Sequence, residues 1–121
     1  MPPESAAYPK SRRLLRPADF RNVYDRGFKV PCSCFVAFCW KEPAGPDPAQ
    51  GPRIGFTAPR VLGKAVARNR MKRRVRETIR KRLAVLDPSW RIVWNLRRAA
   101  RSAPLQLIES EVEKVLSRCS A

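Results

Sequence analysis

Apolar residues recur at every third or fourth position in three stretches of the chain, which predicts three amphipathic helices. The first covers residues 17–26, because a proline begins this range and a glycine follows it. The second runs from about Ala65 to Leu86, and the third opens at Pro104. The residues expected to face the core are Phe20, Val23 and Tyr24 in the first helix, Met71, Val75, Ile79, Leu83 and Leu86 in the second, and Leu105, Ile108, Val112, Val115, Leu116 and Cys119 in the third. The glutamates of the third helix are expected to lie mostly away from its core face; they are Glu109, Glu111 and Glu113.

Three shorter stretches rich in β-branched and aromatic residues predict strands. The first covers residues 29–41, and both of its alternating faces are apolar, which is typical of a strand inside a sheet. The second covers residues 53–58, and we expect it to pair with the first across a proline-rich loop. The third covers residues 90–96. The order α-β-β-α-β-α predicts an α+β sandwich, with helices packed on a small central sheet.

The length of 121 residues suits a single domain, expected over residues 17–121. Residues 1–16 are basic and are predicted to form a flexible N-terminal arm. This arm lacks the apolar segment of a signal peptide, and no apolar run reaches the roughly 18–20 residues that a membrane helix needs. We therefore expect a soluble cytoplasmic protein.

The positive charge of the chain is concentrated in its middle. The 26 lysines and arginines outnumber the 10 acids, and no histidine is present, so the net charge is +16. Residues 53–101 hold 16 of these basic residues and only two acids. Such a density is tolerated best where phosphates neutralise it, which favours nucleic acid as the partner. A merely soluble basic protein remains the simple alternative, and an anionic membrane would require an apolar face left free on the most basic helix.

The four cysteines do not have the spacing of a zinc site, which usually pairs C-x2-4-C knuckles with each other or with histidines. Buried, reduced thiols and no structural metal are therefore expected. Within the first predicted strand, Cys32 and Cys34 are expected to point to one face and Cys39 to the other.

The second predicted helix is strongly cationic outside its apolar stripe. Residues 60–82 carry 11 basic side chains against one acid, whereas an ordinary solvated helix mixes both signs. Its arginines are therefore expected to hold phosphates. Arg68, Lys72 and Arg82 have positions inside the apolar stripe. Lys72 and Arg82 can extend outward, whereas Arg68 either precedes the regular helix or bridges two backbone segments.

The string from Gly63 to Glu77, GKAVARNRMKRRVRE, resembles the signature of the bacterial ribonuclease P protein subunit. That family carries Arg-Asn-Arg, one further residue, and Lys-Arg, matched here by Arg68, Asn69, Arg70, Lys72 and Arg73. The resemblance covers roughly residues 11–119. It includes Asp19-Phe20 in the first helix, Phe35-Val36 in the first strand and Arg53-Ile54-Gly55 in the second.

The resemblance implies a subunit of a ribonucleoprotein endonuclease that removes the 5′ leader of precursor tRNA. In that family the RNA subunit cuts the phosphodiester with Mg²⁺, and one protein per RNA binds without catalytic residues of its own. Carried over by position, the residues contacting the catalytic RNA would be Arg68, Asn69, Arg70, Lys72, Arg73, Arg74 and Arg76. Those receiving the single-stranded leader, in a cleft between the first helix and the sheet, would be Phe20, Tyr24, Phe38 and Arg60.

The family's fold implies one strand more than the pattern predicts, which a break at Pro31 would supply. It also implies a left-handed β-α-β crossover, against the usual right-handed rule. This chain departs from the family at Val61, where a second consecutive lysine is common, so one leader phosphate contact is in doubt. Asn95 to Arg98 follow the family's basic pattern only loosely.

Two other classes compete with this interpretation. A ribosomal or RNA-chaperone protein of similar fold would have the same composition. A protein-only nuclease would need a general base and metal-binding acids, but the chain has no histidine and its ten acids form no evident cluster. Phe20 and Tyr24 have a simpler alternative too, which is to pack the first helix onto the sheet.

Overall fold

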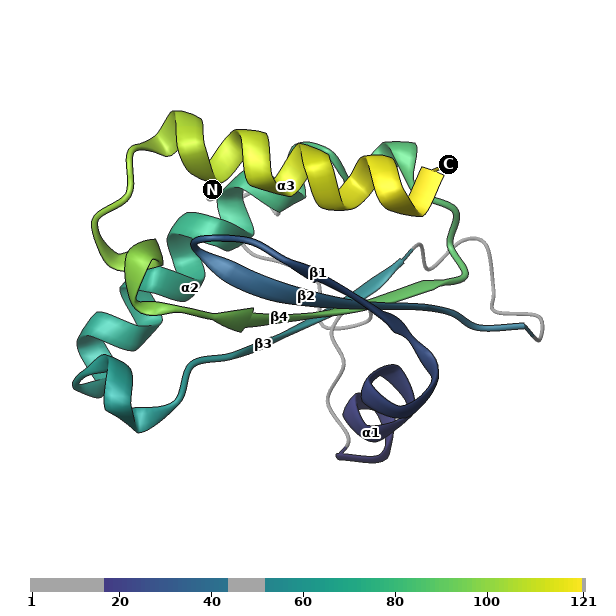
Figure 1. Cartoon of the computed structure of the whole chain (residues 1–121), viewed down its shortest axis with the longest axis horizontal. Helices are drawn as coiled ribbons and strands as arrows, with labels where there is room; N and C mark the ends of the chain where they lie inside the picture. Colours follow the sequence, from purple (N-terminus) through teal and green to yellow (C-terminus); the bar gives the residue numbers. More distant parts are fainter. Residues whose placement is uncertain (1–16, 44–51, 121) are drawn as a thin grey trace, which may run out of the picture.

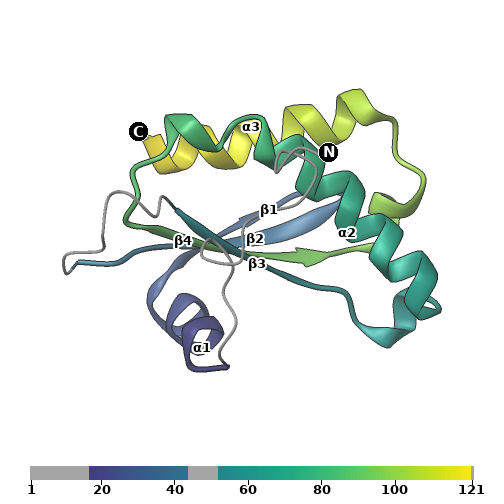
Figure 2. The same cartoon turned by 180° about the vertical axis from the view of Figure 1, so that it is seen from behind.

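The computed structural model describes residues 17–43 and 52–120, in which a four-stranded sheet separates one helix from two others. Helix α1 lies on one face of the sheet, and α2 and α3 lie on the other (Figure 1, and from behind Figure 2). In chain order the elements are α1 (Pro17–Arg26), β1 (Phe28–Pro31), β2 (Phe35–Lys41), β3 (Arg53–Thr57), α2 (Ala65–Arg80), β4 (Trp90–Leu96) and α3 (Leu105–Ser120). Short 3₁₀ turns are η4 (Arg60–Leu62), η5 (Leu83–Val85) and η6 (Arg98–Arg101). The α+β architecture is confirmed, and the predicted arm, residues 1–16, lies outside the described residues.

The strand order is β1-β2-β4-β3, so the expected pairing of the second predicted strand with the first is wrong. Strand β4 lies between them, antiparallel to β2 and parallel to β3. The cause is burial: β4 has five consecutive buried residues and fits a central position, whereas the shorter, partly exposed β3 fits an edge. The parallel pair is joined through α2, and the left-handedness of that crossover stays a prediction.

The first predicted strand is divided into the hairpin β1–β2, which supplies the additional strand that the resemblance implied. Pro31 ends β1, since proline has no amide hydrogen for the ladder. The turn also interrupts the alternation of side chains, so the predicted facing of the cysteines is wrong. Cys34 and Cys39 are buried in one core, and Cys32 packs against it.

The main core fills the space between the sheet and the two helices α2 and α3. It contains the predicted stripe of α2, Met71, Val75 and Ile79, which continues through Leu83 and Leu86. Helix α2 ends at Arg80, short of the predicted end, and η5 carries the last part of that stripe. Most of the predicted α3 face is buried, but Leu105 at its start is 50% exposed.

A smaller core under α1 consists of Val23 and Val93, with Phe20, Phe38 and Trp40 packed against them. Gly27 lies where α1 meets this sheet. A Cβ atom there would be 2.5 Å from the carbonyl oxygen of Cys39, so only glycine allows the close approach of α1 and β2.

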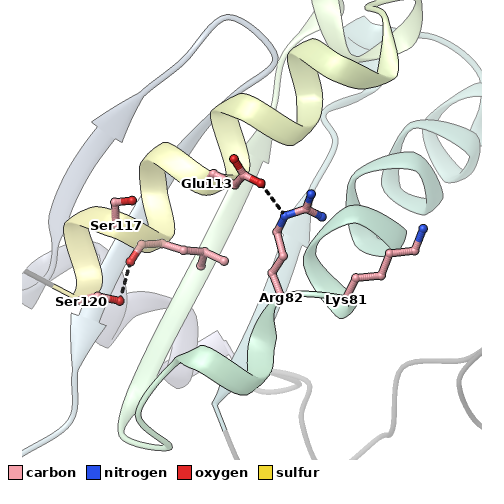
Figure 3. A pocket seen from close by; sticks show the side chains of 6 residues that line it. Lys81, Arg82, Glu113, Ser117 and Ser120 are labelled. Atoms are coloured by element: carbon pink, nitrogen blue, oxygen red, sulfur yellow. Dashed lines mark hydrogen bonds and ion pairs between the residues drawn. The ribbon is translucent and has the colours of Figure 1, made fainter.

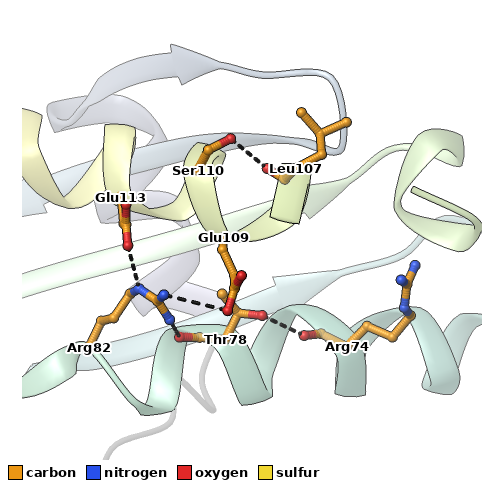
Figure 4. Close-up of polar contacts among 7 residues, drawn as sticks. All are labelled: Arg74, Thr78, Arg82, Leu107, Glu109, Ser110 and Glu113. Carbon is orange, nitrogen blue, oxygen red and sulfur yellow. Dashed lines mark hydrogen bonds and ion pairs between the residues drawn. The ribbon is translucent and has the colours of Figure 1, made fainter. Parts of the chain in front are cut away.

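Arg82 fastens the end of α2 to α3 instead of extending into solvent as expected. Its guanidinium donates to a carboxylate oxygen of Glu113 at 3.1 Å and to the carbonyl of Thr78 at 3.0 Å (Figure 4). Glu109 is a second, longer ion-pair partner at 3.6 Å. A hollow of about 420 Å³ adjoins this contact and is lined partly by Arg82 and Glu113 (Figure 3).

Glu111 fixes the β1–β2 hairpin to α3, and the expectation that it lies away from the core is wrong. Its two carboxylate oxygens accept the backbone amides of Ser33 and Cys34, each at 2.9 Å. Burial alone would raise the pKa of Glu111, but these two donors outweigh it and the pKa is lowered.

We predict that Glu111→Gln lowers the free energy of unfolding by about 1–3 kcal/mol at pH 7, because the amide turns a donor toward one of the two backbone amides. Because the pKa of Glu111 is lower in the folded protein, its carboxylate stabilises the fold fully at pH values above the pKa of the unfolded chain, about 4.3. This stabilisation is lost as the pH falls through the pKa of the folded state. Urea unfolding of both proteins between pH 3 and pH 7 should therefore show curves that converge in acid. Glu113→Gln, an exposed control, should change stability less, and equal losses for the two variants would contradict the assignment.

Candidate nucleic-acid interface

The buried stripe of α2 fixes which of its cations face outward. Asn69, Arg70 and Arg73 are exposed, and Lys72 is half-buried. Arg76 lies over the ring of Phe56, with its guanidinium carbon 5.5 Å from the ring centroid. The predicted motif is therefore displayed as a surface, with Arg70 and Arg73 as its most accessible guanidinium groups.

Arg68 does not belong to that outward set, because it bridges two backbone segments. Its guanidinium donates to the carbonyl of Gly63 at 3.1 Å and to that of Ala58 at 3.1 Å. The expectation that Arg68 bridges two backbone segments is thereby confirmed. Gly63 itself has a φ of 132°, a backbone conformation that glycine adopts without strain. Arg68 thus holds the turn between β3 and α2.

Arg74 also bonds to the protein itself. Its two terminal nitrogens donate to the carbonyls of Ala100 at 2.9 Å and Ala103 at 2.6 Å, so it fixes η6 against α2. Figure 4 shows the neighbouring contacts of α2 with α3. Two residues of the predicted motif, Arg68 and Arg74, therefore shape the surface from within.

Arg97, together with Arg98 and Arg101 of η6, adds three arginines to this surface that were not among the predicted site residues. Arg97 and Arg98 are exposed, and Arg98 donates to the carbonyl of Val61 at 3.3 Å. Arg101 is exposed too, and together with Arg70 it lines two adjoining hollows of about 360 and 420 Å³. The signal available in the sequence was the spacing of these arginines just after a predicted strand.

The charge of α2 is neutralised at one end only. Near its C-terminus Arg80 pairs with Glu77 at 2.7 Å, and beyond it Arg82 pairs with glutamates of α3. At the other end, no carboxylate within residues 17–43 and 52–120 lies within 4.0 Å of Lys64, Arg70 or Arg73. An anionic partner is therefore attracted to the N-terminal half of α2.

On the α1 side of the sheet, the predicted aromatic residues come together. Tyr24 and Phe38 make an edge-to-face contact, with ring centroids 4.8 Å apart. Tyr24 is 37% exposed, whereas Phe20 and Phe38 are half-buried against the small core. Each ring thus both packs and presents part of its surface. Arg60, the fourth predicted leader residue, is exposed in η4, three positions after the end of β3.

Polar groups at the ends of β3 and β4 extend this aromatic surface. The hydroxyls of Tyr24 and Thr57 both donate to Oδ1 of Asn95, at 2.9 Å and 2.6 Å. Thr57 and Asn95 are direct neighbours in the parallel pair. Nothing in the sequence pattern indicated this cluster, because its three members come from three separate elements.

Cys34 and the acids of the described residues form no reactive site. Burial and the nearby carboxylate of Glu111 raise the pKa of Cys34 to about 11, so this thiol is protonated at neutral pH. Among the described residues, no three His, Cys, Asp or Glu side chains are grouped as metal ligands would be. In the same ranges, every helix is too short or too polar to cross a membrane.

Comparisons with known proteins agree in both sequence and fold. Residues 8–120 match the profile of the family described as Ribonuclease P. A "Ribonuclease P protein component" of Symbiobacterium thermophilum is 37% identical over 109 residues, 90% of this chain and 91% of that protein. One of Acidothermus cellulolyticus is 34% identical, covering 91% and 89%.

Two solved structures have the same fold. The RNase P protein of Staphylococcus aureus superposes with a TM-score of 0.73 at 26% identity, covering 90% of this chain and 95% of that one. For the RNase P protein of Thermotoga maritima the TM-score is 0.72 at 25% identity, with coverage of 88% and 96%.

We predict that Arg68→Met destabilises the isolated protein by about 1–2 kcal/mol, because two carbonyls lose a charged donor. Arg70→Met, the same change two positions away on the exposed surface, should stay within about 0.5 kcal/mol of the parent. Thermal unfolding of the three proteins measures the difference. Equal effects of the two substitutions would show that Arg68 is not a structural brace.

Proposed function

Because the chain belongs to the family of ribonuclease P protein components, and so is the protein subunit of an endoribonuclease that matures the 5′ ends of tRNA, we propose that it acts by binding two RNAs and leaves the cleavage to one of them. The catalytic RNA would lie on the exposed face of α2, and the precursor's leader on the α1 side of the sheet. The observation that carries this proposal is the unneutralised N-terminal half of α2, next to the arginines of η6.

The surface around α2 and η6 has the chemistry of a phosphate-binding face. Arg70, Arg73 and Arg101 present forked donors that bind phosphate oxygens in pairs. Lys64 adds a positive charge where the first turn of α2 also directs amide hydrogens outward. The braces Arg68 and Arg74 keep these groups in place before RNA arrives, which reduces the ordering cost of binding.

The α1 side suits a single strand. Unstacked bases gain about 1–3 kcal/mol each on aromatic side chains, and Tyr24 and Phe38 offer partly exposed rings. Arg60 in η4 is exposed, and we propose that it neutralises a phosphate of the same strand. A leader bound here would be single-stranded, since a duplex hides the faces of its bases.

We assign cleavage to the RNA subunit because residues 17–43 and 52–120 hold no group of three acids or cysteines that could bind a metal ion. The sequence contains no histidine to serve as a general base near neutral pH. The Mg²⁺ ions of the reaction would then be held by RNA phosphates, in a complex of one protein per catalytic RNA in the cytoplasm. The family match and the relatives described above favour this function over the competing interpretation, a ribosomal or RNA-chaperone protein.

Reconstitution tests the proposed function as a whole. We expect the full chain, added to a bacterial ribonuclease P RNA at low Mg²⁺, to stimulate cleavage of precursor tRNA and to tighten binding of substrates with a leader. The protein treated with nuclease should cut nothing by itself. Cleavage by that preparation, or no stimulation of the RNA, would refute the proposal.

We further predict that Arg73→Ala weakens binding to the catalytic RNA and reduces the slope of log affinity against log salt by about 0.7–0.9, the value for one phosphate contact. The control is Arg80→Ala, on the same helix, whose guanidinium is already paired with Glu77. Filter binding between 50 and 500 mM salt compares the variants. If both slopes change equally, the division of α2 into a free and a neutralised end is wrong.

A further inference from the structure

Two of the four cysteines come together where the end of α3 lies on the sheet (Figure 1). Cys119 is the last member of the buried stripe of α3, and Cys39 lies in β2; both belong to the main core. The thiol of Cys39 donates a hydrogen bond to the sulfur of Cys119. Both residues are free thiols in this structure.

A contact between residues next to this pair places the same two elements together independently. Phe28 of β1 is directly opposite Cys39 in the antiparallel pair, so the two side chains share the face of the sheet that borders the main core. The guanidinium carbon of Arg118 lies 5.9 Å from the centroid of the Phe28 ring. Because Cys119 follows Arg118 directly, the last turn of α3 is held beside Cys39. The backbone thus already brings the two thiols together, which is the first requirement of a disulfide.

The two thiols differ in exposure and in acidity. Cys39 is fully buried, whereas Cys119 is 7% exposed and lies one residue before the end of α3, where a helix opens most readily. The hydrogen bond from Cys39 and the charge of Arg118 lower the pKa of Cys119. The same hydrogen bond and burial raise the pKa of Cys39. An oxidant therefore meets Cys119 first, with Cys39 next to it as the second thiol.

The other two cysteines are less suited to this reaction. Burial raises the pKa of Cys32, and burial together with Glu111 raises the pKa of Cys34 to about 11. The backbone amide of Cys34 is also bonded to Glu111. Within residues 17–43 and 52–120, no group of three potential metal ligands is present, so the thiol pair is not part of a metal site there.

We propose that Cys39 and Cys119 form a redox-sensitive couple, which a peroxide oxidises to a disulfide that fastens the last turn of α3 to β2. The thiolate of Cys119 attacks one oxygen of hydrogen peroxide, the O–O bond breaks, and the hydroxide released takes up the thiol proton as water. The sulfur of Cys39 then attacks the sulfenic acid on Cys119 and displaces hydroxide, which leaves with the proton of Cys39 as a second water. Two thiols thus lose two electrons and two protons, and one peroxide becomes two waters. A dithiol reductant reverses the reaction by thiol–disulfide exchange.

Mass spectrometry of the full chain tests the pairing. The reduced protein is treated with hydrogen peroxide, denatured in iodoacetamide and digested with chymotrypsin, which cuts after Phe38 and so separates Cys39 from the two earlier cysteines. We expect one disulfide between the peptides of Cys39 and Cys119, with the other two cysteines alkylated. If Cys119 stays reduced, is oxidised without a partner or is joined to another cysteine, the proposal is overturned.

Thermal unfolding tests the effect on the fold. The disulfide closes a loop from residue 39 to residue 119, which restricts the unfolded chain far more than the folded one. Oxidation should therefore raise the Tm by roughly 8–20 °C, and dithiothreitol should reverse the rise. Cys119→Ala should abolish the rise, whereas the matched control Cys32→Ala should keep it.

The outcomes of the thermal experiment are equally decisive. An unchanged or lowered Tm of the disulfide-linked protein, a rise that persists in Cys119→Ala, or a rise that is lost in Cys32→Ala overturns the proposal. If a variant does not fold, the pairing and the Tm shift of the unaltered chain decide. Neither measurement uses RNA, so each result stands apart from the proposed function.

Discussion

The parallel pairing of β3 with β4 is the constraint on which the rest of the structure depends. It requires the chain to cross the sheet through α2, which places the cationic helix over one face. It also brings the carboxyl ends of both strands to the same edge, so that η4 and η6 follow side by side. The bond from Arg98 to the Val61 carbonyl and the cluster of Thr57 with Asn95 both depend on this adjacency.

Arginine serves two purposes in this protein, and its surroundings decide which. Where carbonyls that end a turn lie within reach, as for Arg68 and Arg74, the guanidinium satisfies several of them and becomes part of the framework. Where only solvent is near, as for Arg70 and Arg73, the charge remains available to phosphates. The acids of α3 neutralise Arg82 at the far end, so the excess charge is directed to the half of α2 beside η6.

The helices, β4 and the α2 stripe were predictable because they depend on residues close in sequence, whose spacing records which side is buried. The strand order was not, since it depends on which strand can be buried on both faces. Glu111 was missed for a similar reason: its partners, Ser33 and Cys34, are more than 70 positions away and offer only backbone amides. Arg68 was recognised as unusual because a charge inside an apolar stripe conflicts with the local pattern, whereas Arg74 conflicts with nothing nearby.

At Val61, comparing the sequence with the family's motif and comparing the charges that lie close together in the fold lead to different conclusions. The resemblance leads to the expectation of a lysine at this position, but Val61 is 72% exposed and has no polar group on its side chain. In space, the guanidinium of Arg98 lies at the carbonyl of that same residue, 3.3 Å away. A phosphate responds to the field at a point and not to the residue that supplies it. A cation from η6 therefore lies close to the place where the sequence of η4 lacks one, and Arg60 and Arg98 add to one cationic surface across the two turns.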